Sequence, residues 1–309
     1  MQHYRHRCAV LGKPIAHSLS PVLHMAAYRR LALSDWQYLR HEVDAAGLEE
    51  LLSSLDPSWA GLSLTMPLKR TVMPFGTPSD TWSSTLQVAN TAVLDWTGAA
   101  KAPTISLYNT DVQGISKALG TELVRLDTDA AGSSTPTLSR SDGHVQVHTA
   151  MILGSGNTAS SALAACSELG AEQVVVCARH PERAAHLSML AERLGIGMQV
   201  RTLSQALSAV DGQDVTISTL PAHAADGIAD ELSHQARHGD LGLLLDVVYD
   251  PRPSRLMTAW RDKGARAIGG EMMLLYQAIP QVALMTGIDE HSMPSDIDMA
   301  MLQGLQEVL

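Results

Sequence analysis

Four short segments of the sequence gather polar side chains that suit the binding of a small polyhydroxylated acid. They are residues 12–21, 61–69, 88–91 and 108–114. Together they offer hydroxyl groups, an amide, the ammonium group of a lysine and a carboxylate. We expect these segments at strand ends and turns, where the ligand sites of α/β proteins lie. Such a lining can bind both the hydroxyls and the carboxylate of a small acid.

The Gly-rich segment 153–159 has the pattern Gly-x-Gly-x-x-Ala of a dinucleotide-binding turn. An apolar strand is predicted before it, at 149–153, and a helix of small residues after it, which is the context that the pattern requires. Gly154 allows the tight turn, Gly156 lets a pyrophosphate approach the backbone, and Ala159 packs the helix on the sheet. The N–H groups at the start of the helix hold the phosphates. The alternative is an ordinary turn without a ligand.

The end of the next predicted strand, at 173–178, bears on which nicotinamide cofactor is bound. An NAD site carries Asp or Glu there for the ribose 2′-OH, whereas an NADP site offers an arginine to the 2′-phosphate. Here Arg179 follows the strand, Arg183 comes one helical turn later, and Glu172 stands at the opposite end. A guanidinium group binds phosphate through two parallel N–H bonds. The pattern therefore favours NADP(H), and a solvated arginine is the alternative.

The elements that must position these residues alternate between strands and helices. The apolar pattern predicts strands at 8–12, 36–43, 59–64, 149–153, 173–178, 214–219, 241–247 and 266–268, and helices at 45–55, at 159–169 and from 270 onward. Another helix is predicted with Ser20 as N-cap and Pro21 at its first position. Residues 91–108 alternate around Gly98 and predict a hairpin. Residues 127–147 have little apolar content and predict a partly disordered linker.

Composition excludes several classes of protein. The 309 residues carry a formal net charge of −10 and exceed what one core usually organises, so we expect two domains. No basic cluster indicates a nucleic-acid partner, and no apolar run indicates a membrane span or a signal peptide. Cys8, Cys166 and Cys177 are scattered in apolar patterns, as expected of reduced core thiols in the cytoplasm. His144 and His148 do not lie on a predicted helix, and no metal-binding motif occurs, so we expect no metal.

The order of these segments resembles that of the shikimate dehydrogenases. The four polar segments come first, the Gly-rich turn follows, and residues 218–221, 246–251 and 270–277 match three later elements of the family. The resemblance spans almost the whole chain except its ends and 127–147. It implies an NADP-dependent oxidoreductase that reversibly reduces 3-dehydroshikimate to shikimate in aromatic amino-acid (chorismate) biosynthesis.

The resemblance also implies an α/β fold of two domains. Residues 1–111 are expected to form the substrate-binding catalytic domain, and residues 112–269 a Rossmann-type NADP-binding domain. Residues 270–309 are expected to return as helices to the first domain. The expected partner is the small-molecule substrate, and the expected oligomeric state is a monomer or a homodimer.

Site residues follow from the same resemblance, position by position. The family's catalytic residues match Lys69 and Asp111; its substrate-binding residues match Ser18, Ser20, Thr65, Asn90, Tyr249 and Gln277; the cofactor-binding set is Gly154, Ser155, Gly156, Asn157, Thr158, Ala159, Arg179, Thr219 and Gly270. A lysine ammonium can stabilise the developing alkoxide or transfer its proton, and Asp111 would orient it. Which of the two moves the proton stays open, and a surface ion pair is the alternative. Asn90 could instead form a turn, whereas an unpaired Gln277 in a core would cost about 1–3 kcal/mol.

Departures from the family pattern concern substrate and cofactor preference. Ser63 stands where the family usually has Asn, so we expect one ring-hydroxyl contact to be shortened or water-mediated. Met25 stands where Asn is common, and Ala178 and His180 flank Arg179 where Asn and Thr are common. The rivals are a quinate/shikimate dehydrogenase that uses NAD, a folate-linked dehydrogenase and a catalytically silent ligand-binding homologue. The first is disfavoured because no acid stands at the strand end. The Ser-x-Ser-Pro and Asn-Thr-Asp segments argue against the second. The retained lysine and aspartate argue against the third.

Overall fold

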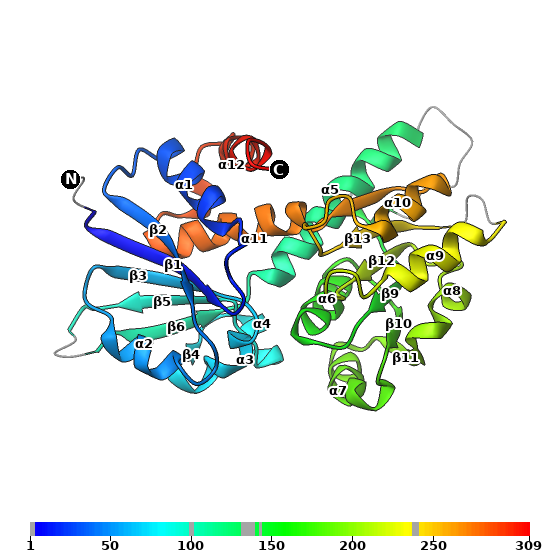
Figure 1. The fold of residues 1–309 in the computed structure, drawn as a ribbon, viewed down its shortest axis with the longest axis horizontal. Coiled ribbons are helices and arrows are strands. Elements are labelled where there is room, and N and C mark those ends of the chain that lie inside the picture. The colour runs from blue at the N-terminus through cyan, green and yellow to red at the C-terminus, as the bar shows by residue number, and fades with distance from the viewer. Residues whose placement is uncertain (1–3, 99–101, 131–139, 142–143, 237–240) are drawn as a thin grey trace. The chain divides into compact units, whose positions relative to one another are not determined.

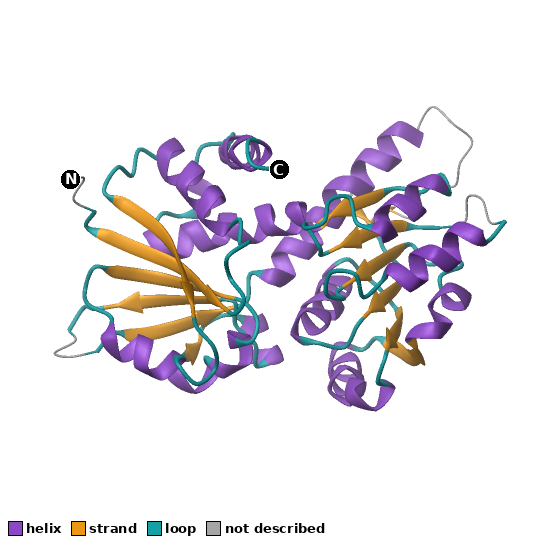
Figure 2. Ribbon diagram, in the orientation of Figure 1, coloured by secondary structure: helices purple, strands orange, loops and turns teal. Residues whose placement is uncertain are grey.

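The structure, a computed structural model, describes residues 4–98, 102–130, 140–141, 144–236 and 241–309. It divides into two compact units. Unit 1 consists of residues 1–110 and 274–309, and unit 2 of residues 111–273. Each unit has a sheet of six strands with helices packed on it, as the colours of Figure 2 show. The predicted α/β class is confirmed.

Unit 1 contains a mixed sheet with the strand order β2-β1-β3-β5-β6-β4. Its elements are β1 (His6–Gly12), α1 (Ser20–Arg30), β2 (Trp36–Glu42), α2 (Leu48–Ser54), β3 (Trp59–Leu64), α3 (Leu68–Thr71), β4 (Thr77–Pro78), α4 (Thr81–Leu86), β5 (Thr91–Asp95), β6 (Thr104–Tyr108), most of α11 (Gly270–Thr286) and α12 (Ile297–Gln306). Strand β1 pairs in parallel with β2 and β3. Strands β5 and β6 form the predicted antiparallel hairpin.

Alternation along β3 separates the two faces of this sheet. Leu62 and Leu64 are buried in a core that α2 and α3 complete. Residues one position away must point to the opposite face, because successive side chains of a strand alternate. On that face a side chain at Gly61 would lie 2.4 Å from Met285 of α11, so the helix packs tightly there. Ser63 points to the same face, and Figure 1 shows α11 and α1 on the side of the sheet opposite α2.

Unit 2 is built on a wholly parallel sheet with the order β11-β10-β9-β12-β13-β14. Its elements are α5 (Asp111–Ala130), β7 (Arg140–Ser141), β8 (His144–Val145), β9 (Thr149–Leu153), α6 (Asn157–Glu168), β10 (Gln173–Ala178), α7 (Ala185–Leu194), β11 (Gly197–Thr202), α8 (Ala206–Ala209), β12 (Val215–Ser218), α9 (Asp226–His234), β13 (Leu243–Asp246), α10 (Arg255–Asp262) and β14 (Ala267–Gly269). In chain order this is 3-2-1-4-5-6, the Rossmann arrangement. The central strands β9, β12 and β13 are buried at every position except Thr149, because a parallel sheet is covered on both faces.

Two local predictions were wrong. Ser20 is not the N-cap of α1: Leu19 is, because its carbonyl accepts the first helical bonds from Val22 and Leu23. The predicted linker at 127–147 begins inside a helix, since α5 continues to Ala130. Within that segment β7 also pairs with β8, while 131–139 and 142–143 lie outside the described residues.

The core contains the three cysteines of the chain. Cys8, Cys166 and Cys177 are buried free thiols, and burial raises the pKa of Cys8 to about 12. No helix in the described ranges is long and apolar enough to cross a membrane. The same ranges contain no group of three or more His, Cys, Asp or Glu side chains that could hold a metal ion.

Candidate functional site

Backbone hydrogen bonds bring three of the polar segments together in unit 1. The N–H of Lys13, after β1, donates to the carbonyl of Met66, after β3, at 2.9 Å. The N–H of Ala89 donates to the carbonyl of Lys69, also at 2.9 Å. Neighbouring parallel strands deliver their following loops to the same edge of the sheet, so the first of these contacts follows from the pairing of β1 with β3. The half-buried Thr65 and Lys69 therefore lie beside the segment that carries Asn90.

Asn90 and Gln277 form a buried polar cluster with Thr110. Asn90 Nδ2 donates to Thr110 Oγ1 at 2.9 Å and to Gln277 Oε1 at 3.2 Å. The backbone N–H of Thr110 donates to Asn90 Oδ1 at 2.8 Å. Asn90 is 2% exposed and Gln277 6%, which explains why each needs partners within the fold. Asp111, the first residue of α5, directly follows Thr110 and is also buried.

Ser18, just before α1, and Ser20, its first residue, are buried as well. Ser18 Oγ accepts from the backbone N–H of Ser20 at 3.4 Å, and the Ser18 carbonyl accepts from Arg40 Nε at 2.8 Å. The carbonyl of Ser20 bonds the ring Nδ1 of His24 at 2.9 Å. Both serines thus lie at the start of a helix whose dipole favours anions.

Ser63 takes part in buried hydrogen bonds on the α11 face of the sheet. Its Oγ accepts from the Tyr38 hydroxyl at 2.6 Å and donates to Gln281 Oε1 at 2.8 Å. Its side chain is on the α11 face of the sheet, and the residue is 4% exposed. Since a serine hydroxyl has one proton, Ser63 cannot donate to a ligand while this bond to Gln281 is made. The expectation of a shortened or water-mediated substrate contact has no support in these hydrogen bonds.

His24 makes the stability of the fold depend on pH. Burial lowers the pKa of His24 to about 4, from an ordinary value of 6.5. Between these values the unfolded chain binds a proton that the folded chain does not, so stability falls as the pH falls through this window. The loss amounts to about 3 kcal/mol between pH 6.5 and pH 4. We expect His24→Phe to remove this component, as measured by urea unfolding at several pH values.

A matched variant of an exposed histidine checks this prediction. The side chain of His291 is 97% exposed, so His291→Phe should leave the dependence on pH unchanged. An identical acid dependence in the wild-type protein and in His24→Phe would contradict the assignment.

In unit 2 the Gly-rich turn has the conformation that a phosphate-binding turn needs. Gly154 has φ +112°, and a Cβ there would lie 2.5 Å from Thr219 Oγ1. Gly156 is the N-cap of α6, and a Cβ there would meet nothing within 4 Å. In the described part of the chain, no side chain caps this helix through a hydrogen bond. The open space beside Gly156 at a helix N-terminus fits the close approach of a pyrophosphate.

Alanine substitutions should separate the roles of the two glycines. We expect Gly154→Ala to destabilise the protein by about 2 kcal/mol or more, because it combines a left-handed φ with the close approach to Thr219. Gly156→Ala adds a methyl group to open space at φ −89° and should cost less than about 1 kcal/mol. The same methyl group should weaken NADP binding about tenfold or more, because it occupies the space beside the helix start. Thermal unfolding and NADP titration measure the two effects; equal stability losses would contradict the distinction.

The other residues predicted to bind the cofactor follow the carboxyl ends of the strands in the same sheet. Arg179 is exposed and follows β10 directly. Thr219 follows β12, and its N–H donates to the carbonyl of Leu153 at 2.8 Å. Gly270 follows β14, and a Cβ there would lie 2.0 Å from the carbonyl oxygen of Val247. The sheet therefore brings these residues to the edge that carries the Gly-rich turn.

The predicted site residues thus divide between the units. Ser18, Ser20, Thr65, Lys69, Asn90 and Gln277 belong to unit 1, and Asp111, Tyr249 and the nine residues predicted to bind the cofactor belong to unit 2. Sequence reasoning missed Tyr38, Thr110 and Gln281 as members of the buried polar network. Gln281 could have been found, because it lies four residues after Gln277 on the same apolar helix.

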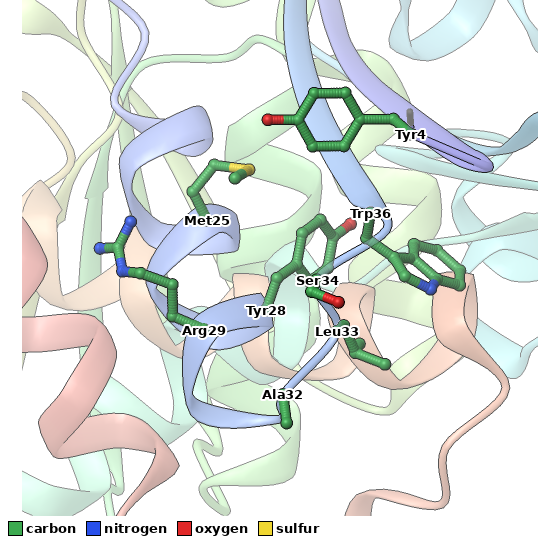
Figure 3. A pocket seen from close by; sticks show the side chains of 8 residues that line it. All are labelled: Tyr4, Met25, Tyr28, Arg29, Ala32, Leu33, Ser34 and Trp36. Atoms are coloured by element: carbon green, nitrogen blue, oxygen red, sulfur yellow. The ribbon is translucent and has the colours of Figure 1, made fainter. Parts of the chain in front are cut away.

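A pocket of about 400 Å³ in unit 1 lies away from these residues. Figure 3 shows Met25 and Arg29 of α1 on one side of it and Trp36, the first residue of β2, on another. It is therefore at the amino end of β2, whereas the polar segments follow the carboxyl ends of β1 and β3. Tyr28 and Trp36 are only 1% and 8% exposed, so these rings offer little surface to a ligand.

Comparisons with known proteins agree with this division. The sequence model of a family described as "Shikimate dehydrogenase substrate binding domain" matches residues 10–92. Another, described as "NADP oxidoreductase coenzyme F420-dependent", matches residues 149–244. The first therefore covers much of unit 1, and the second covers the Rossmann strands β9 to β12.

Relatives match nearly the whole chain. A shikimate dehydrogenase (NADP(+)) of Methanococcoides burtonii is 30% identical over 281 residues, which are 90% of this chain and 91% of the relative. The crystal structure of Mycobacterium tuberculosis shikimate dehydrogenase superposes with a TM-score of 0.79 at 34% identity, covering 98% of this chain and 100% of that one. A shikimate 5-dehydrogenase of Mycobacterium fortuitum gives a TM-score of 0.75 at 35% identity, covering 96% and 97%. The chain belongs to the shikimate dehydrogenase family.

Proposed function

We propose that this protein is an NADP-dependent shikimate dehydrogenase, which reversibly reduces 3-dehydroshikimate to shikimate. The observation that carries the proposal is the buried cluster of Asn90, Thr110 and Gln277 beside Lys69 in unit 1. Buried amides that donate and accept at a strand edge can bind the hydroxyls of a polyhydroxylated ring. Unit 1 is accordingly the substrate-binding unit in this proposal, and unit 2 the cofactor-binding unit.

The residues of unit 2 fit NADP(H). Gly154, Ser155, Gly156, Asn157, Thr158 and Ala159 would hold the pyrophosphate at the start of α6, Arg179 the 2′-phosphate, and Thr219 and Gly270 the remainder of the cofactor. The open space at Gly156 supports this assignment, because a Cβ would fill it. The strand that precedes Arg179 ends without an acid, which favours NADP over NAD. When bound, NADPH supplies the hydride for the ring ketone.

The proton chemistry would fall to Lys69 and Asp111. As the ketone is reduced its oxygen gains negative charge, and the Lys69 ammonium would stabilise that charge or give up a proton to it. Asp111 would orient the ammonium and a ring hydroxyl. The proposal does not decide between the two as the group that moves the proton.

The remaining proposed roles concern recognition of the substrate. Ser18 and Ser20 at the start of α1, with Tyr249, would bind the substrate carboxylate. Thr65, Asn90 and Gln277 would bind ring hydroxyls. We place the reaction in aromatic amino-acid (chorismate) biosynthesis in the cytoplasm. A monomer or a homodimer stays the predicted oligomeric state, and we expect no nucleic-acid partner.

Following nicotinamide absorbance during turnover tests the function. Shikimate and quinate are each combined with NADP and with NAD, in four reactions. We expect activity with shikimate and NADP to be much higher than in the other three. Activity with quinate and NAD would instead indicate a catabolic quinate dehydrogenase, and a folded protein inactive in all four reactions would indicate a ligand-binding homologue.

A further inference from the structure

We infer that Tyr38, Ser63 and Gln281 are positioning residues that orient the amides of Asn90 and Gln277 for the substrate, an inference that rests on the proposed function. All five lie in unit 1. Tyr38 and Ser63 are each 4% exposed, and Gln281 is 1% exposed. A series of hydrogen bonds runs from Tyr38 to Gln277, and in each bond the donor can be assigned.

The middle of the series is fixed by a backbone carbonyl. Gln281 Nε2 lies 3.2 Å from the carbonyl oxygen of Asn90, which can only accept, so this end of the amide carries the N–H groups. The opposite end, Oε1, therefore faces Ser63 and must accept the Ser63 proton at 2.8 Å. Because Ser63 has no second proton, it accepts from the Tyr38 hydroxyl.

From Gln281 the series continues through Thr91 to Asn90. Gln281 Nε2 also donates to Thr91 Oγ1 at 2.9 Å. Since Thr91 accepts there, its single proton is directed to Asn90 Oδ1, at 2.9 Å. The backbone N–H of Thr110 donates to the same oxygen and independently identifies it as Oδ1. The orientation of the Asn90 amide is thus set by one backbone donor and by the series.

The last bond reaches Gln277. With Oδ1 fixed, Asn90 Nδ2 donates to Gln277 Oε1 at 3.2 Å. Gln277 Nε2 donates to the carbonyl of Leu274 at 3.0 Å, which again can only accept. The donor and acceptor ends of both amides are therefore defined: both N–H groups of Asn90 are used in these contacts, and Gln277 Nε2 has one N–H beyond its bond to Leu274. Rotation of either amide would exchange those ends and mismatch the ring hydroxyls.

The direction of the series predicts graded effects on substrate binding. Tyr38→Phe removes only the first donor and leaves the bond from Ser63 to Gln281 intact. Ser63→Ala removes the donor to Gln281 Oε1 and leaves that amide held through Nε2 by the Asn90 carbonyl and Thr91. Gln281→Glu keeps the shape, but a carboxylate cannot donate to Thr91, so Thr91 turns its proton to the carboxylate and away from Asn90. We expect KM for shikimate to rise by about twofold, fivefold and tenfold or more in this order, with kcat and KM for NADP within about threefold of wild type.

Steady-state kinetics on the purified full chain, with thermal unfolding of each variant, test the inference. Gln306→Glu is the matched control, because Gln306 is an exposed glutamine of α12 in the same unit. Its KM should equal that of the wild-type protein. If Gln281→Glu does not fold, the comparison of KM for shikimate between Ser63→Ala and Tyr38→Phe tests the positioning role.

Three results would overturn the inference. An unchanged KM for shikimate in Ser63→Ala and in any folded Gln281→Glu protein refutes the positioning role alone. A parallel rise in KM for shikimate and in KM for NADP indicates a general loss of packing and also refutes the positioning role. A wild-type protein that neither binds nor oxidises shikimate refutes the proposed function together with the positioning role.

Discussion

Replacing Lys69 by alanine is expected to lower kcat for shikimate oxidation by about 100-fold or more. The reason is that the ammonium group is the proposed stabiliser and proton partner of the substrate oxygen, and alanine supplies neither charge nor proton. Binding of NADP should stay nearly unchanged, because the lysine is proposed to act on the substrate. Turnover at saturating substrate and NADP titration of the same preparation measure the two quantities.

A second lysine variant separates this effect from a general loss of positive charge. Lys117 is an exposed lysine of α5, and Lys117→Ala should retain wild-type turnover. If Lys69→Ala turned over shikimate at a rate close to that of Lys117→Ala, the catalytic assignment of Lys69 would be wrong. A loss of NADP affinity equal to the loss of kcat would also contradict it.

Replacing Arg179 by alanine is expected to raise KM for NADP by about tenfold or more and to change KM for NAD little. A guanidinium group at the end of β10 would bind the 2′-phosphate, which NAD lacks. The expected result is therefore a change in the ratio of the two cofactors rather than a common loss. Initial rates with each cofactor at saturating shikimate give that ratio.

The control is another exposed arginine of unit 2. Arg193 lies on α7, and Arg193→Ala should leave both KM values at the wild-type level. An equal rise in KM for NADP and in KM for NAD in Arg179→Ala would contradict the assignment of Arg179 to the 2′-phosphate. Because both arginines are exposed, a difference between the variants cannot be attributed to packing.

Local patterns in the sequence were sufficient for much of the fold. The apolar run at Gln173–Ala178 predicted β10 residue for residue, and Trp59–Leu64 did the same for β3. Gly98 has φ +76°, and β5 and β6 on either side of it pair as the expected hairpin. These elements were predictable because burial on one or both faces of a sheet demands a regular apolar pattern.

Predictions failed where a boundary depends on a few hydrogen bonds or on distant packing. Ser20 has the side chain of an N-cap, yet it is the first residue of the helix, and the N-cap is Leu19, whose carbonyl accepts the first bonds. Residues 127–130 have a composition typical of a linker, but they extend a helix whose earlier residues, such as Ile115 and Leu119, are buried. Composition reports an average over a segment, whereas a helix end is set by its last packed turn.

The kind of site could be predicted from local patterns: the Gly-rich turn after a strand, the arginine at the next strand end, and the polar segments that resemble those of shikimate dehydrogenases. Which polar groups bond one another depends instead on how distant parts of the chain pack. This packing joins Ser63 to Gln281, 218 residues apart, and Asn90 to Gln277, 187 residues apart. Strand alternation places Ser63 on one face of β3, but the helix that covers this face comes from the far end of the chain. Hydrogen-bond partners so distant in sequence leave no local pattern from which to predict them.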